Sequence, residues 1–442
     1  MKKLILILVL ISTGCQTQSL QPTLVSIAMQ SGNAYYVSVS GSDSNPGTQS
    51  LPWKTIQKCL NQVQPGWACQ IMAGTYNESL ALKTSGTASA RITLKNYNNQ
   101  TVTVNSGSSL TVYTSGNISY YTIDGLRLIS TATASGQNDV SIDISKNVNN
   151  RDGYPNDGNN GFVLSNCYVE GAILIFGHNN VVENCEFNGK GTWYNGIHDR
   201  MAASHDNTYQ NNMIHDYITR GVWTMQNTSN ITIEGNTIYN VENGIDCDGA
   251  YVAVTNCVVR KNTIHDTHGV GLGMQLEDAF EAVVDSNKVY NTSRGIFISN
   301  YGVNSSDGWS AVQEYRNLAT NMQITNNQIS NSSIGIFCYG ALGITAVGNV
   351  ISAASTDGIQ LTHYDNYFCD NWVIKSNTIS GSNMWVDASN TPHLASDYNI
   401  YSSGVKFYWR AYDTSMGYAA STYTLTQLQS VKQLELHSSV VN

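Results

Sequence analysis

Two aspartates stand two residues apart in the segment 244–249, which reads Gly-Ile-Asp-Cys-Asp-Gly. In an extended strand Asp246 and Asp248 point to the same side, about 6.6–7 Å apart. Such a pair serves two chemistries. It can bind Ca²⁺ through oxygen, with Glu277 or Asp278 from the next repeat completing the cage. It can also supply the acid and base, or the acid and nucleophile, of a glycoside hydrolase.

A bound Ca²⁺ would support β-elimination on an acidic sugar. The metal would neutralise a substrate carboxylate and acidify the neighbouring proton, which His198, Arg200 or Arg220 would remove. An arginine stays charged in most settings and needs an unusual site to act as a base. We therefore prefer His198 as the base, with Asp246, Asp248, Glu277 and Asp278 as the metal ligands.

A repeated sequence motif predicts the elements that position these residues. The motif is Asn followed by any residue and an aliphatic residue, and it recurs at a spacing of roughly 22–28 residues. A period of that length built from short strands predicts an all-β, right-handed parallel β-helix. We expect the Asn to lie at the same bend of each coil in a left-handed conformation, with its amide bonded to the Asn of the next coil. The copies begin at Asn212, Asn236, Asn262, Asn287, Asn327, Asn349, Asn377 and Asn399, and Cys167 and Cys185 replace Asn in two earlier ones.

A Gly followed by an apolar residue aligns as a second column, and strand alternation then predicts which side chains point outward. The first predicted outward column is His198, Trp223, Asp246, Gly273, Phe297, Phe337 and Gln360. The second is Arg200, Met225, Asp248, Gln275, Ser299, Tyr339 and Thr362, and the position before the Gly adds Asn195, Arg220, Asn243, Val270 and Arg294. Carboxylates, guanidiniums, an imidazole and an indole on one face predict a saccharide site, and the alternative is a charged surface held by internal salt bridges.

Aromatic faces stack on sugar rings, and charged groups bind uronate carboxylates. An insertion at 301–320 lengthens one repeat, and a second insertion lies at 147–160. Such insertions often form the sides of a binding surface. The predicted substrate-binding residues are Trp223, Gln275, Arg294, Phe297, Tyr339 and, within the first insertion, Trp309.

The N-terminus predicts export. Lys2 and Lys3 precede an apolar run at 4–11 that is too short to span a bilayer, and Ser12-Thr13-Gly14-Cys15 resembles a bacterial lipobox. We therefore expect a signal peptide at 1–15, lipidation of Cys15, a tether at 16–34 and a single β-helix domain at 35–442. The protein would be a surface or periplasmic lipoprotein, or otherwise secreted, and a monomer whose partners are a polysaccharide and a membrane. The net charge of −9 argues against nucleic acid.

Eight cysteines follow Cys15, and an exported chain can pair some of them. A short N-terminal helix is predicted to cap the open end of the coils, and this helix and the strand after it would bring Cys59 and Cys69 together. Cys167 and Cys185 fall at the same bend of successive coils, where they would stack or bond. Cys247 and Cys338 fall at inward positions and are expected to be small core residues.

The opening of the chain combines a strand at 35–38, a Gly/Asn/Pro loop at 41–48, a helical face around 53–63 and a strand ending in Ala73-Gly74-Thr75-Tyr76. This order resembles the start of bacterial β-helix polysaccharide lyases of the pectate lyase type, and residues 396–403 resemble their closing coil. The resemblance implies a carbohydrate-active enzyme, and a lyase on a uronate-containing polymer with Ca²⁺ is our first expectation.

Three alternatives stay open. The first is a glycoside hydrolase, and the second is a glycan-binding surface protein without activity. The third is a uronan C5-epimerase, because His198-Asp199-Arg200 is similar to a stretch of the alginate epimerases. The outward columns hold no Lys, whereas lyases of the pectate type often use a Lys as the base.

Overall fold

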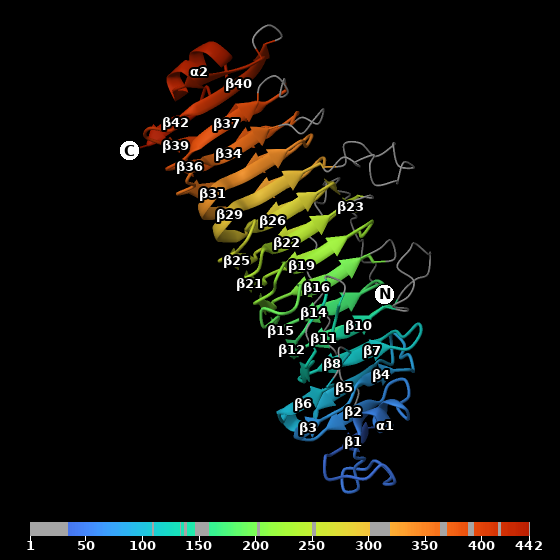
Figure 1. Cartoon of the computed structure of the whole chain (residues 1–442). Coiled ribbons are helices and arrows are strands. Elements are labelled where there is room, and N and C mark those ends of the chain that lie inside the picture. The colour runs from blue at the N-terminus through green and yellow to red at the C-terminus, as the bar shows by residue number, and fades with distance from the viewer. Residues whose placement is uncertain are drawn as a thin grey trace, which may run out of the picture. The chain divides into compact units, whose positions relative to one another are not determined.

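The computed structural model describes residues 34–107, 110–132, 134–136, 139–145, 159–200, 204–249, 253–300, 319–362, 369–387, 393–413 and 417–441. The β-helix belongs to the compact unit Asn33–Asn442, whose coils stack in chain order (Figure 1). Residues 1–33, including Cys15, and Trp309 lie outside the described residues. No helix in the described part of the chain is long and apolar enough to span a membrane.

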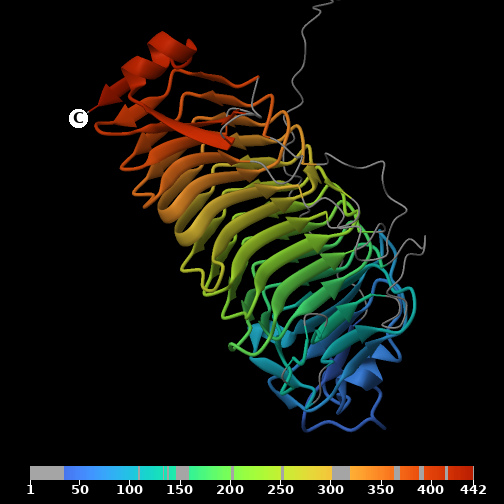
Figure 2. The same ribbon diagram turned by 45° about the horizontal axis from the view of Figure 1, so that its top comes forward.

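Each coil contributes strands to three parallel stacks, which Figure 2 shows from a second direction. The first stack contains β1 (Ala34–Val37), β2 (Ala68–Ile71), β5 (Ile92–Asn96), β8 (Tyr121–Asp124), β11 (Val163–Ser165), β14 (Val181–Glu183), β17 (Thr208–Gln210), β20 (Thr232–Glu234), β24 (Val258–Arg260), β28 (Val283–Asp285), β30 (Gln323–Thr325), β32 (Thr345–Val347), β35 (Val373–Lys375) and β38 (Ala395–Asp397).

The second stack contains β3 (Gly74–Tyr76), β6 (Val102–Asn105), β9 (Arg127–Ile129), β12 (Tyr168–Glu170), β15 (Glu186–Asn188), β18 (Met213–His215), β21 (Thr237–Tyr239), β25 (Thr263–His265), β33 (Val350–Ser352), β36 (Thr378–Ser380), β39 (Ile400–Ser402) and β42 (Ser439–Val441). The long strands β29 (Lys288–Ser299) and β31 (Gln328–Tyr339) run through both the second and the third stack.

The third stack carries the predicted outward columns. It contains β4 (Leu80–Leu82), β7 (Val112–Thr114), β10 (Ile142–Ile144), β13 (Ile173–Ile175), β16 (Asn195–Arg200), β19 (Arg220–Met225), β22 (Asn243–Asp248), β26 (Leu272–Glu277), the ends of β29 and β31, β34 (Asp357–Thr362), β37 (Asn383–Asp387) and β40 (Phe407–Asp413). β41 (Gly417–Tyr423) pairs antiparallel with β40, and a small pair joins β23 (Val254–Thr255) to β27 (Ala279–Phe280).

Alternation of side chains explains the core. In β22, Ile245 and Cys247 are fully buried inside the coil, and their register partners on both neighbouring strands are also inward and apolar or small. One inward column of the third stack consists of Ile197, Val222, Ile245, Met274, Ile296, Ile336 and Ile359, none of which is exposed. The repeated coils therefore share one continuous apolar interior.

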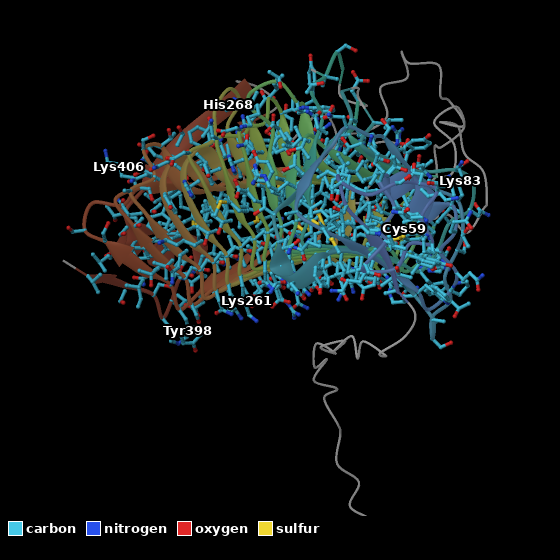
Figure 3. All side chains as sticks on the ribbon, turned by 90° about the horizontal axis from the view of Figure 1, so that it is seen from below. Cys59, Lys83, Lys261, His268, Tyr398 and Lys406 are labelled. Carbon is cyan, nitrogen blue, oxygen red and sulfur yellow. A yellow bond between two sulfur atoms is a disulfide. The ribbon has the colours of Figure 1, made fainter. Side chains whose placement is uncertain are left out.

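The predicted Asn ladder is confirmed, but its backbone conformation differs from the prediction. The Asn262 amide donates to Asn287 Oδ1 at 3.0 Å, and Asn262 Oδ1 accepts from the Asn236 backbone N–H at 2.9 Å. The left-handed residue is the one before each ladder Asn, such as Asn211 or Lys261. The bend is made one residue earlier, which leaves the ladder side chain free to point into the coil. In Figure 3, Lys261 and Tyr398 mark this bend column.

Both ends of the stack are covered. Helix α1 (Ile56–Leu60), with Thr55 as its N-cap, packs against the first coils and confirms the predicted capping helix. At the other end, helix α2 (Leu425–Lys432) precedes Glu435, a fully buried carboxylate. Glu435 accepts hydrogen bonds from the Asn399 amide at 3.1 and 3.2 Å and from the Tyr401 hydroxyl at 2.9 Å. It thus occupies the place of the next Asn in the ladder.

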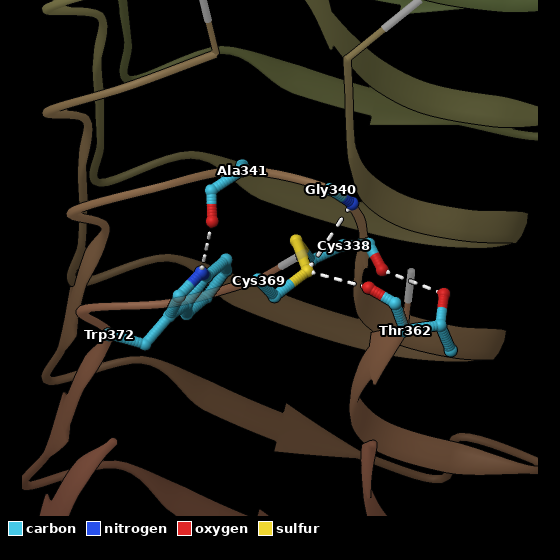
Figure 4. The surroundings of a disulfide bond; sticks show 6 residues. All are labelled: Cys338, Gly340, Ala341, Thr362, Cys369 and Trp372. Carbon is cyan, nitrogen blue, oxygen red and sulfur yellow. Dashed lines mark hydrogen bonds between the residues drawn. A yellow bond between two sulfur atoms is a disulfide. The ribbon is translucent and has the colours of Figure 1, made fainter. Parts of the chain in front are cut away.

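Three disulfides tie neighbouring segments together. Cys59–Cys69 confirms the predicted pair. The expectation that Cys247 and Cys338 are unpaired core residues is wrong, because they pair with Cys257 and Cys369. Figure 4 shows the second of these beside Thr362, whose Oγ1 donates to the Cys338 carbonyl at 3.1 Å.

Cys167 and Cys185 are free and buried. They continue the Asn ladder with sulfur, since the Cys167 backbone N–H lies 3.3 Å from Cys185 Sγ.

Candidate functional site

The third stack aligns nearly all the predicted site residues, with one correction. Asp246 pairs with Gln275 and Asp248 with Glu277, so Gln275 belongs to the first outward column and Glu277 to the second. The sequence analysis aligned this coil on Gly271 instead of Gly273. Its columns were therefore wrong by two residues here, and they wrongly included Gly273 and Val270. A Cβ on Gly244 would lie 2.5 Å from the carbonyl oxygen of Gly273, so the glycine column marks a close backbone contact.

The corrected columns, read along the stack, are as follows. The first outward column is His198, Trp223, Asp246, Gln275, Phe297, Phe337, Gln360, Trp385 and Tyr408. The second outward column is Arg200, Met225, Asp248, Glu277, Ser299, Tyr339 and Thr362.

The strand-start column is Asn195, Arg220, Asn243, Leu272, Arg294, Ile334, Asp357 and Asn383.

Four carboxyl groups meet on β22 and at the end of β26. We call Asp246, Asp248, Glu277 and Asp278 the acidic cluster. Asp246 is fully buried and accepts from Arg220 Nε at 2.6 Å, while the other three are 5–9% exposed. Asp248 accepts from the Trp223 indole N–H at 3.1 Å. The amide of Gln275 donates to Glu277. The cluster therefore combines an ion-paired carboxylate with others near the surface.

Burial sets the protonation of this cluster. It raises the pKa of Glu277 to about 9, and the negative charges of Asp248, Asp246 and Asp278 add to the effect. Burial also raises the pKa of Asp246 to about 7, with Asp248 acting in the same direction and the guanidinium of Arg220 opposing it. At neutral pH, Glu277 is therefore an acid that still carries its proton beside carboxylates.

Trp223 links the acidic cluster to its neighbours on both sides. The Arg220 guanidinium lies 4.1 Å from the indole centroid. On the other side the His198 ring stacks on the indole at 4.4 Å with an angle of 12°. Trp223 itself is 7% exposed, so it forms part of a packed layer.

His198 lies beneath this layer. It is 1% exposed, its Nε2 is 3.5 Å from Met225 Sδ, and its Nδ1 has no hydrogen-bond partner among the described residues. Burial, with help from the charges of Arg200 and Arg220, lowers the pKa of His198 well below the usual value. Its role as a base stays a prediction, and its ring would have to be uncovered to reach a substrate.

The side chains of the other two residues in the His198-Asp199-Arg200 stretch point in opposite directions. Arg200 points outward with His198 and donates to Gln226 at 3.3 Å. Asp199 points into the coil, where it accepts from the Tyr209 hydroxyl at 2.5 Å and the Asn207 amide at 3.1 Å. Burial raises the pKa of Asp199 to about 6. Asp199 therefore belongs to the core and does not join the outward face.

A second group of predicted residues lies farther along the stack. Arg294 lies over the Phe297 ring at 4.9 Å and over the Phe337 ring at 4.7 Å, and these two rings stack at 5.3 Å. Tyr339 follows on the next column, 6.0 Å from Phe337. Within the described residues Arg294 forms no ion pair, in contrast to Arg220. It therefore presents a positive charge beside an aromatic surface.

The acidic cluster does not offer an oxygen cage. Among the described residues, no group of three or more His, Cys, Asp or Glu side chains is placed to hold a metal ion. N–H donors from Arg220, Trp223 and Gln275 already contact Asp246, Asp248 and Glu277, respectively. Because Ca²⁺ requires six to eight oxygen ligands, this arrangement does not fit it, and we derive no step through a metal.

Three residues on this face were missed from the sequence. Trp385 and Tyr408 continue the first outward column and stack on each other at 5.5 Å. Asp357 continues the strand-start column, and burial raises its pKa to about 6. The inward–outward alternation of Met384, Trp385 and Val386 could have revealed Trp385. The glycine that marks the other coils is absent there, and the register shifts between Asp357 and Ile359.

Comparisons with known proteins agree with this architecture. The family model described as "Pel9A-like, right handed beta helix region" matches residues 35–212. The model "Right handed beta helix region" matches residues 154–308. The chain is a right-handed β-helix protein. The resemblance to β-helix enzymes of the pectate lyase type is thereby confirmed.

Solved structures share this fold at low sequence identity. The GH136 lacto-N-biosidase from Eubacterium ramulus is 15% identical with a TM-score of 0.54, over 84% of this chain and 68% of that one. A mannuronic acid specific polysaccharide family 6 lyase from human gut microbiota is 13% identical with a TM-score of 0.55, over 85% and 88%. The PL6 alginate lyase AlyGC is 12% identical with a TM-score of 0.55, over 84% and 54%.

A curated relative matches only a short part of the chain. It is the uncharacterized protein YwoF of Bacillus subtilis (strain 168), which is 41% identical over 80 residues. The matched part is 18% of this chain and 17% of YwoF.

Proposed function

We propose that this right-handed β-helix is an exported enzyme that cleaves glycosidic bonds of a polysaccharide lying along the third stack. One observation carries the proposal: Asp248 and Glu277 are register partners on neighbouring strands, beside Trp223 on the same outward face. Neighbouring strands are about 4.8 Å apart. Two carboxyl groups at about that separation on one outward face are the parts a glycosidase needs.

The roles follow from protonation and exposure. Glu277 would donate its proton to the departing glycosidic oxygen. Asp248 would act on the opposite side as the nucleophile, because carboxyl groups about 5 Å apart leave no room for the water that an inverting enzyme activates. Asp246 is fully buried and ion-paired with Arg220, so we assign it a positioning role. Hydrolysis then balances, because the hydroxyl of water goes to the sugar and its proton restores the carboxyl group.

β-Elimination is the second candidate. The Pel9A-like match includes His198 and Arg200, and lyases as well as a hydrolase occur among the structures with this fold. Elimination would need His198 or an arginine as the base. The hydrolase is preferred because Asp248 and Glu277 retain 7% and 9% exposure, whereas His198 is 1% exposed and its ring stacks on Trp223. Calcium, expected from the sequence, is not part of this proposal, and chelation followed by activity measurement would test whether it is needed.

The compartment is also part of the proposal. Three disulfides among the described residues fit an oxidising environment. Together with the predicted signal sequence, they support export with lipidation at Cys15.

The test is product analysis on a set of acidic and neutral polysaccharides. A hydrolase releases reducing ends without new ultraviolet absorbance, while a lyase produces an absorbing unsaturated sugar. Glu277→Gln and Asp248→Asn should each lower kcat/KM by about 10²–10⁴-fold, whereas Glu281→Gln, an exposed carboxyl in the loop after β27, should not change it. Near-normal rates in both site variants would overturn the assignment.

The pH profile adds an independent check. Because Glu277 must carry its proton to act, kcat/KM should fall as pH rises through about 9.

A further inference from the structure

The first outward column continues beyond the acidic cluster toward the C-terminus. It passes through Phe297 and Phe337 to Gln360, Trp385 and Tyr408. Gln360, Trp385 and Tyr408 are half-buried, so each presents part of its side chain to solvent. Nothing in the acid chemistry proposed above uses these last three residues.

Two ring stacks border the rung of Gln360. Phe297 and Phe337 stack at 5.3 Å with an angle of 13°, and Trp385 and Tyr408 stack at 5.5 Å with an angle of 29°. Rings stacked along the axis turn their outer faces toward the neighbouring rungs. The other faces of Phe337 and Trp385 therefore both look toward Gln360, from strands about 9.6 Å apart, which is two inter-strand spacings. Phe337 is only 9% exposed, so the half-buried Trp385 and Gln360 present most of the accessible surface.

The amide of Gln360 has no hydrogen bond or ion pair among the described residues. It can donate and accept at once. A sugar ring offers the matching surfaces, because its C–H faces pack on aromatic rings and its hydroxyl groups bond to an amide. A surface that only faced water would not need two aromatic stacks around one unpaired amide.

We propose that Phe337, Gln360 and Trp385 form a distal subsite that binds one sugar unit of a polysaccharide chain. The inference rests on the proposed function, and it specifies the substrate as a polymer long enough to reach from the acidic cluster to Trp385. The rung of Trp385 lies four spacings from that of Glu277, about 19 Å. A disaccharide cannot reach both, whereas a chain along the stack can.

The test measures binding separately from cleavage. Native gels cast with polygalacturonate, alginate or xylan would retard the wild-type protein in at least one of them. The variants are Trp385→Ala and Gln360→Ala. The matched control is Tyr398→Ala, an aromatic side chain that is 54% exposed at the bend column marked in Figure 3. Thermal melts identify any variant that fails to fold.

We expect Trp385→Ala and Gln360→Ala to weaken binding about 2–10-fold, the range given by one aromatic contact. Tyr398→Ala should bind as the wild type does. Glu277→Gln should keep its retardation while losing turnover. Folded Trp385→Ala and Gln360→Ala proteins with wild-type retardation would overturn the subsite.

The two proposals fail in different ways. If no polysaccharide is cleaved but Trp385→Ala still weakens retardation, the protein binds glycans at the subsite and the enzyme assignment is wrong. If Glu277→Gln is inactive and Trp385→Ala binds normally, the enzyme stands and the subsite is wrong.

Discussion

At the scale of single residues, the acidic cluster is the least predictable part of this protein. The sequence showed that Asp246 and Asp248 share a face. It also predicted Glu277 or Asp278 close to them, but it could not show that Glu277 is the direct partner of Asp248, because that depends on the register between β22 and β26. Protonation depends on the same contacts, since burial and three neighbouring carboxyl groups together raise the pKa of Glu277.

Glu277 should make stability depend on pH. Its folded pKa of about 9 lies above the ordinary value of 4.5, so the folded state prefers the protonated form. The associated stability is complete below about pH 4.5 and is lost as pH rises through about 9. Glu277→Gln cannot ionise, so it should melt a few degrees above the wild type at pH 9.5 and at a similar temperature at pH 4.5.

Differential scanning calorimetry across this pH range measures the effect, with Glu281→Gln as the control. An equal melting temperature for Glu277→Gln and the wild type at pH 9.5 would contradict the raised pKa.

At the scale of elements, the Asn ladder is the feature that the sequence predicts best. Eight Asn residues at a regular spacing indicated both the coil and the bonds between coils, and the structure confirms both. The conformation was assigned to the wrong residue because an Asn is also a common left-handed residue. Only the three-dimensional bend separates the two roles, with Lys261 left-handed and Asn262 pointing inward.

The register error has an equally local cause. The segment 271–274 reads Gly-Leu-Gly-Met, so two Gly-apolar pairs compete for one column. Gly271 takes a positive φ of 69° at a turn, and Gly273 makes the close contact with the neighbouring strands. Spacing alone does not distinguish them, but a contact distance does.

Removing one ladder amide should destabilise the coil strongly. The side chain of Asn262, which is 1% exposed, accepts from the backbone and the amide of Asn236 and donates to Ile233 and Asn287. Asn262→Ala leaves these buried partners unpaired and should lower the free energy of unfolding by about 2–4 kcal/mol.

Asn262→Cys should cost less, because sulfur already replaces Asn at Cys167 and Cys185. Urea unfolding measures both variants, with the exposed Asn77→Ala as the control. A cost for Asn262→Ala no larger than that of Asn77→Ala would show that the ladder bonds contribute nothing net.

Two of the disulfides should differ in their contribution to the free energy of unfolding. Cys338–Cys369 closes a segment of 31 residues and Cys59–Cys69 one of 10. Loop-closure entropy then predicts losses of about 3.7 and about 2.7 kcal/mol for the two double Cys→Ala variants. Urea unfolding of the two proteins side by side gives the comparison. A larger loss for the shorter loop would mean that packing around Cys59 outweighs chain entropy.

At the scale of the whole molecule, a solenoid is stabilised by contacts between neighbouring coils, so its ends decide where unfolding begins. α1 covers the first coils, and Glu435 closes the Asn ladder at the last one. The sequence predicted a closing coil at residues 396–403, but not that a single carboxylate takes the place of an Asn. Glu435 follows no repeat, and only its contacts with Asn399 and Tyr401 reveal its role.

Glu435→Ala should loosen one end only. It leaves the donors of Asn399, Tyr401, Ser396 and Ser438 without their buried acceptor. The expected cost is about 2–4 kcal/mol. Hydrogen exchange should increase in β36 and β39 and stay unchanged in β5 and β8.

Leu436→Ala is the matched control, since this neighbouring side chain is 52% exposed. Faster exchange spread evenly over all coils would show that the solenoid unfolds as one unit.

The spacing of the outward columns has a consequence for recognition. Backbone hydrogen bonds fix the distance between rungs, so no side-chain substitution can change it. A linear ligand on this face therefore meets side chains at a constant spacing. Discrimination between polymers then depends on which rungs carry a reactive, aromatic or charged group. A polymer whose sugar repeat does not match the spacing of the rungs would lose its alignment with these groups along its length.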